Sequence, residues 1–102
     1  MSYTETLAKL GVTLPDAPAP AANYVPAIRS GDLLFVSGQI SNGPDGLIKG
    51  RLGDDMSVED GAAAARACAI SLLAQVKAAC GGDIERLEQV VKLTAFVNCT
   101  PE

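Results

Sequence analysis

The sequence predicts an α+β domain in which a mixed β-sheet is packed on one face by helices. Two segments with alternating apolar residues, 33–40 and 87–99, flank an apolar stripe at helical spacing over residues 57–80. The chain has 102 residues, of which 48% are apolar and 20% are charged. This length and composition fit one globular domain, so we treat residues 1–102 as a single domain.

The N-terminal quarter predicts a short helix followed by an extended connection. Residues 3–10 are compatible with a helix that ends at Gly11. Residues 14–22 contain three prolines, which exclude helix and central strand and favour a polyproline-like segment. Pro15 and Pro18 also fit a PxxP recognition peptide, but no basic residue lies nearby, so a connecting loop is the preferred interpretation.

A β-hairpin is predicted over residues 24–29 and 33–40, because the residues between them, Ser30-Gly31-Asp32, are typical of a tight turn. Along the second strand one face is apolar, and we expect it to meet a helix. The other face becomes polar toward its end, where a ligand or another subunit could bind. The apolar face carries Leu34, Val36, Gly38 and Ile40, and the second face carries Leu33, Phe35, Ser37 and Gln39.

Residues 41–53 are loop-like and contain glycines at positions 43, 46, 50 and 53, with a possible short strand at 47–49. The glycine spacing matches neither a P-loop nor GxGxxG. We therefore predict no nucleotide site in this loop.

The clearest helix covers residues 57–80. Ser57 is a suitable N-cap, Glu59 and Asp60 fit the first turn, and Gly81-Gly82 ends the helix. An alanine-rich apolar stripe follows, which we expect to face the sheet; its members are Val58, Ala62, Ala65, Ala69, Leu72, Val76 and Cys80. The acids at 54, 55, 59 and 60 are better explained as a solvated helix start than as a cation site.

A third strand is predicted over residues 87–99, with an apolar face that includes Val91, Leu93 and Val97. Strand, helix and strand at this spacing are typical of a right-handed βαβ crossover. Thr100-Pro101-Glu102 has the composition of a helix start. We therefore expect a further C-terminal segment that this sequence does not include; a frayed natural terminus is the alternative.

Composition and charge exclude several classes of function. The chain has no histidine, which rules out histidine triads and histidine metal ligands within it. A net charge of −4 without a basic cluster disfavours nucleic-acid binding. Arg66 interrupts the longest apolar run, so we expect no membrane span, and without a signal sequence we expect a cytoplasmic protein.

The three cysteines predict no disulfide framework. Cys68 and Cys80 on one helix would lie about 18 Å apart, too far for a disulfide. With Cys99 they are interpreted as reduced structural thiols.

Several ordered motifs together resemble the YjgF/RidA family of reactive-intermediate imine deaminases, also labelled endoribonuclease L-PSP or translation inhibitor. They are AANYVP at 21–26, SGDLLFVSGQI at 30–40, Ala65-Arg66, Gly81-Gly82 and VVKLTAFVN at 90–98. The resemblance covers nearly all of residues 11–99, and the longer lead-in is similar to a subgroup with an extended N-terminus. It implies a chorismate-mutase-like fold with two helices on one sheet face, and a homotrimer with pockets between subunits.

The resemblance also implies a chemistry: hydrolysis of enamines and imines to 2-keto acids and ammonia, without metal or organic cofactor. By resemblance Tyr24, Ser37 and Gly38 line the substrate pocket. The arginine that clamps the substrate carboxylate, and an acid that places water, would lie beyond Glu102. Arg29, Arg51, Arg66 and Arg86 match neither, so the catalytic residues stay unknown and deaminase activity depends on that later arginine.

Two other functions remain open. A trimer that binds a small acid without turnover needs only the semi-polar strand faces. A ribonuclease or translation inhibitor, an older label for this family, is disfavoured by the acidic charge and the lack of histidine.

Overall fold

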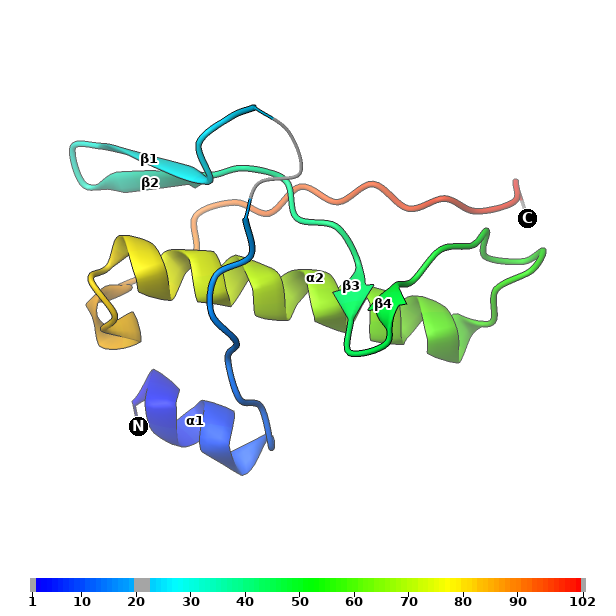
Figure 1. The fold of residues 1–102 in the computed structure, drawn as a ribbon, viewed down its shortest axis with the longest axis horizontal. Helices are drawn as coiled ribbons and strands as arrows, with labels where there is room; N and C mark the ends of the chain where they lie inside the picture. The colour runs from blue at the N-terminus through cyan, green and yellow to red at the C-terminus, as the bar shows by residue number, and fades with distance from the viewer. Residues whose placement is uncertain (1, 20–22, 102) are drawn as a thin grey trace.

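A computed structural model describes residues 2–19 and 23–101. Figure 1 shows a long central helix with a β-hairpin on one side and the N-terminal helix on the other. The elements are α1 (Tyr3–Lys9), β1 (Ala27–Ser30), β2 (Leu33–Val36), β3 (Asn42–Gly43), β4 (Gly46–Leu47), α2 (Val58–Ala79) and the 3₁₀ helix η1 (Ile84–Arg86). The predicted α+β class is confirmed, with small antiparallel sheets β1–β2 and β3–β4.

Helix α1 forms where the sequence predicts it, because both ends carry their caps. The Ser2 hydroxyl accepts from the Glu5 amide at 3.0 Å, and the Glu5 carboxylate accepts from the Ser2 amide at 3.4 Å. This reciprocal capping box satisfies two otherwise unpaired donors. Gly11, at φ +69°, follows the last turn in the left-handed region that ends helices.

A distant carboxylate holds α1 in place. Glu85 of η1 accepts from the backbone amides of Tyr3 at 2.9 Å and Thr4 at 2.7 Å, and from the Thr4 hydroxyl at 2.6 Å. The Tyr3 hydroxyl also donates to the Glu88 carbonyl at 3.1 Å. The hydrogen bonds from Thr4 lower the pKa of the Glu85 carboxyl below its ordinary value, since they stabilise the charged form.

The predicted hairpin is confirmed with shorter strands. β1 and β2 pair antiparallel, with Ile28 opposite Phe35 and Ser30 opposite Leu33. Gly31, at φ +60°, makes the turn. Along β2 the side chains of Leu34 and Val36 are half-buried, while Leu33 and Phe35 are exposed, as the alternation predicts.

The alternation breaks after Val36, and the predicted faces of the next residues are wrong. The Ser37 amide still donates to the Pro26 carbonyl at 2.9 Å, but β2 ends before it. Ser37 and Gln39 are half-buried, whereas Gly38 and Ile40 are exposed. Once the chain leaves the strand ladder, the period of two no longer fixes which side a residue faces.

Helix α2 has the predicted bounds. Ser57 is its N-cap and accepts from the Asp60 amide at 3.1 Å, and the positive φ values of Gly81 and Gly82 follow its end. By length and composition α2 could also cross a membrane, a criterion that the core helices of globular domains meet as well. The predicted lack of a membrane span stays a prediction.

The predicted alanine-rich stripe of α2 is covered only along its second half. Val58, Ala62, Ala65 and Ala69 are exposed, whereas Leu72, Val76 and Cys80 are half-buried. Along the first half the covered positions form a neighbouring stripe with the same spacing, which continues to Gln75; its members are Gly61, Ala64, Cys68, Ser71 and Gln75. Periodicity identified the helix correctly but not the covered stripe of its first half, because small side chains fill both.

Residues 87–99 do not form the predicted strand. Figure 1 shows this segment running back along α2 after η1, and its one backbone bridge to a neighbour joins Leu52 to Cys99. Val91 and Leu93, expected to be buried, are 75% and 72% exposed. A strand needs a partner backbone about 4.8 Å away, and no other described segment pairs with this one. The predicted βαβ crossover is therefore not formed among residues 2–19 and 23–101.

The loop at residues 50–53 is hydrogen-bonded to the end of the extended segment 87–99 and to Thr100. The Leu52 amide donates to the Asn98 carbonyl at 3.0 Å, and the Thr100 amide donates to the Leu52 carbonyl at 2.9 Å. The Asn98 side chain donates to the Gly50 carbonyl at 3.1 Å. These bonds fix the end of the extended segment beside the start of α2.

Candidate functional site

A small pocket lies between the proline-rich lead-in, the end of β2 and the middle of α2. Its volume is about 60 Å³. Tyr24, Ser37 and Gly38, the three residues predicted to line a substrate pocket, all line it. The remaining lining residues are Pro18, Ala19, Pro26, Gln39, Ile40, Asn42, Ser71 and Gln75. The structure thus brings the three candidate residues together at one cavity, although whether they bind substrate stays a prediction.

Ser37 presents an unused hydrogen-bonding group at this pocket. Its Oγ is buried and has no hydrogen-bond partner within the described chain. Leaving a buried hydroxyl unpaired costs about 1–3 kcal/mol, so such groups usually meet a ligand or water. A carbonyl, imine or amide group in the pocket could pair with it.

Tyr24 and Gly38 line the more open side. Tyr24 is 43% exposed and Gly38 is exposed. Because Gly38 is predicted to line the pocket, a side chain at this position is expected to enter it. The structure shows instead that a Cβ at Gly38 would meet nothing within 4 Å, and its φ is not in the left-handed region. In this chain the residue is therefore not required to be glycine by sterics.

Two further lining residues come from α2 and were missed by the sequence analysis. Ser71 and Gln75 are 7% and 3% exposed, and both contribute to the pocket. The Gln75 Nε2 donates to the Pro18 carbonyl at 2.8 Å and lies 3.5 Å from the Gln39 Oε1. A serine and a glutamine spaced four apart in the otherwise apolar stretch 67–76 were the available signal.

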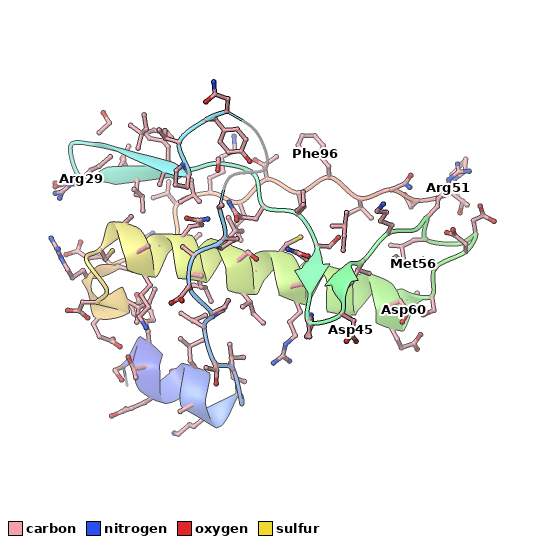
Figure 2. The ribbon with its side chains drawn as sticks, in the orientation of Figure 1. Arg29, Asp45, Arg51, Met56, Asp60 and Phe96 are labelled. Atoms are coloured by element: carbon pink, nitrogen blue, oxygen red, sulfur yellow. The ribbon has the colours of Figure 1, made fainter. Side chains whose placement is uncertain are left out.

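The lining residues that the structure describes are all uncharged. Arg29 donates from Nε to the Gly31 carbonyl at 2.8 Å and lies 3.8 Å from Asp32. Arg51 lies in the loop before α2, at the other end of the molecule from Arg29 (Figure 2). Neither these residues nor Arg66 and Arg86 line the pocket. A substrate carboxylate would need a cation from elsewhere.

Metal and thiol chemistry have little support in the described part of the chain. No cluster of three or more Cys, Asp or Glu side chains there could hold a metal ion. Cys68, Cys80 and Cys99 are free thiols, as expected from their spacing, and none lines the pocket. The expectation of a reaction without metal or organic cofactor stays a prediction.

Comparison with known proteins gives consistent matches. Residues 4–101 match the family described as "YjgF/chorismate mutase-like, putative endoribonuclease". Protein TCP17 of Trypanosoma cruzi is 49% identical over 96 residues, which cover 93% of this chain and 59% of that protein. These matches extend over the motifs on which the resemblance was based.

Two crystal structures are similar in fold. One, titled a "putative endoribonuclease" from Shewanella oneidensis MR-1, is 35% identical with a TM-score of 0.72, over 79% of this chain and 54% of that one. The other, protein Atu1372 of unknown function from Agrobacterium tumefaciens, is 44% identical with a TM-score of 0.67, over 79% and 49%. The chain therefore spans between about half and three fifths of the length of these relatives.

Proposed function

This chain belongs to the YjgF/chorismate mutase-like family, and from that membership we propose that the complete protein hydrolyses reactive enamines and imines to 2-keto acids and ammonia. The observation that carries the proposal is the pocket that gathers Tyr24, Ser37 and Gly38 around an unpaired, buried hydroxyl. In this reaction water adds to the imine carbon and the C–N bond breaks. The water oxygen becomes the keto oxygen, and its two protons leave on nitrogen as ammonia.

The chain's own residues suit the uncharged part of such a substrate. The Ser37 hydroxyl can donate to, or accept from, the imine nitrogen, and the hydroxyl of Ser71 and the amide of Asn42 can hold water beside it. The pocket of about 60 Å³ is sized for a small molecule fragment rather than a polymer. The carboxylate would be clamped by an arginine from outside residues 2–101, as the resemblance implies.

We also propose that the active form is a homotrimer with its pockets between subunits. The hairpin face away from α2 carries exposed apolar side chains, among them Ile28, Leu33 and Phe35. The extended segment adds Phe96, which is 96% exposed and points away from α2 in Figure 2. Exposed apolar surface of this kind favours an interface with further copies, which could also supply a cation for the substrate carboxylate.

A ribonuclease is the second candidate, because the family and the Shewanella protein are both described as a "putative endoribonuclease". Cleaving RNA requires groups that hold phosphates and activate a 2′-hydroxyl. The described pocket lining contains uncharged side chains, and the net charge of the chain is −4. These observations favour the deaminase.

The test compares both activities on one preparation of the complete protein. An enamine is generated in the assay by a pyridoxal-phosphate dehydratase acting on serine, and 2-keto acid and ammonia release are followed. RNA cleavage is measured before and after one further purification step. Faster ammonia release, with RNA cleavage lost on purification, is expected. Unchanged release with retained RNA cleavage would support the ribonuclease, and affinity for 2-keto acids without turnover would support a binding module.

A further inference from the structure

The lead-in segment before the hairpin forms one wall of the pocket, and a single side chain attaches it. Pro18 and Ala19 line the cavity. The prolines at positions 15 and 18 have no amide hydrogen to donate, so this stretch cannot join a sheet by regular pairing. Within the described residues, the one hydrogen bond from segment 13–19 to the rest of the chain is that of Gln75 with the Pro18 carbonyl.

Gln75 is well suited to this task. It is 3% exposed, and its Nε2 contacts the wall at Pro18, 2.8 Å away, and the pocket loop at Gln39, 3.5 Å away. A buried amide is stable only while its groups are paired, so its orientation is coupled to the position of the wall. Gln75 thereby ties three parts of the pocket together: α2, the lead-in and the loop after β2.

We propose that Gln75 is a positioning residue that fastens the Pro18 wall, and that this wall sets the upper size of the ligand. With the wall held on Gln75, the cavity measures about 60 Å³, and we expect it to favour a short side chain. Releasing the wall would admit larger side chains without changing the groups that meet the imine. The attachment of the Pro18 wall by Gln75 is independent of the proposed deaminase reaction. The limit on ligand size rests on that proposed function.

The test uses Gln75→Met in the complete protein, since methionine has a similar side-chain volume but cannot donate a hydrogen bond to the Pro18 carbonyl. Gln89→Met is the matched control, because Gln89 is exposed and lines no pocket among the described residues. Backbone ¹⁵N relaxation reports the mobility of the wall directly. Loss of the anchor should lower the order parameters at Asp16, Ala17 and Ala19 from about 0.85 to below about 0.6, with the thermal midpoint and hydrogen exchange in α2 unchanged. Unchanged order parameters at these three amides would overturn the attachment.

The proposed limit on ligand size is tested by two measurements. The kcat/KM ratio for an imine with a branched four-carbon side chain, over one with a methyl group, should rise about fivefold in Gln75→Met, through KM rather than kcat. Binding of pyruvate and 4-methyl-2-oxopentanoate, measured by titration, should shift in the same direction. Lower order parameters in the wall, with both ratios unchanged, would overturn the size limit alone.

These readouts separate the proposal from the proposed function. If the wild-type protein shows no turnover but the wall order parameters and the keto-acid binding change as expected, the deaminase is wrong and the Gln75 proposal stands. If neither keto acid binds to either protein, the size limit is overturned. If turnover is present and the order parameters are unchanged, the deaminase stands and Gln75 has no positioning role.

Discussion

Ile28 lies directly opposite Phe35 in the hairpin, and the two side chains are 57% and 61% exposed on the face away from α2. Cross-strand apolar pairs normally stabilise a sheet by being covered. This exposed pair therefore identifies the face on which the proposed trimer would assemble.

Placing a charge in this pair should separate the subunits without unfolding them. In Phe35→Glu a carboxylate would have to be buried without a partner, which opposes association. Light scattering should report monomer for this variant and trimer for the wild type, with similar helix content by circular dichroism. Gln89→Glu, which adds the same charge elsewhere, should remain a trimer. A trimeric Phe35→Glu protein would place the interface on another face.

Removing the Ser37 hydroxyl should weaken ligand binding while leaving the fold intact. The Oγ has no partner in the described chain, so Ser37→Ala removes a buried unpaired group, and the free energy of unfolding should stay equal or rise slightly. Pyruvate binding should weaken about fivefold to tenfold, the worth of one hydrogen bond of about 1 kcal/mol. Titration calorimetry with a thermal melt checks both. Lower stability with unchanged binding would mean that Ser37 is structural.

The contact between Glu85 and α1 should depend on pH. Because its hydrogen bonds lower the pKa of the Glu85 carboxyl, the ionised form stabilises the folded state. That contribution is fully present above the unfolded-state pKa of about 4.3 and is lost as the pH falls through the lower folded-state pKa. Hydrogen exchange in residues 3–9 should accelerate over that range, before α2 is affected.

Glu85→Gln should produce the same release of α1 at neutral pH. Glu88→Gln is the matched control, since it removes the same charge three residues away, and among the described residues the Glu88 side chain makes no hydrogen bond to α1. Equal exchange of α1 in the two variants would show that the Glu85 carboxylate does not hold the helix.

Substitution by alanine should lower the free energy of unfolding at Gly53 but not at Gly38. Gly53 has φ +87°, and a Cβ there would collide with the Thr100 side chain, so Gly53→Ala should destabilise the protein by about 1–2 kcal/mol. Gly38→Ala has open space and an ordinary φ, and should melt within about 0.5 kcal/mol of the wild type. Chemical denaturation of both variants measures the difference. A destabilised Gly38→Ala protein would indicate that another subunit packs against that position.

Local signals in the sequence predicted the local elements well. The end of α1 at Gly11, the two ends of α2 and the turn at Gly31 each depend on a few neighbouring residues, so they could be identified without knowing the rest of the fold. The three pocket residues Tyr24, Ser37 and Gly38 were reached through the family resemblance rather than through such signals.

The predictions that were wrong are those that depend on packing between elements distant in the sequence. The covered stripe of α2 and the faces of Ser37 and Gln39 depend on long-range packing that alternation and helical period do not specify. The extended state of residues 87–99 likewise depends on whether a partner strand is present. Gln75 was missed because its role arises only when Pro18, distant in sequence, is brought beside it.

The most direct test of the central claim is ammonia release from 2-aminoacrylate by the complete protein and by its Ser37→Ala variant. The account predicts that the wild type accelerates release and that Ser37→Ala, folded and trimeric, has a kcat/KM lower by about fivefold or more. Release at the uncatalysed rate by the wild type would contradict the deaminase. Equal rates for the two proteins would contradict the assignment of the reaction to this pocket.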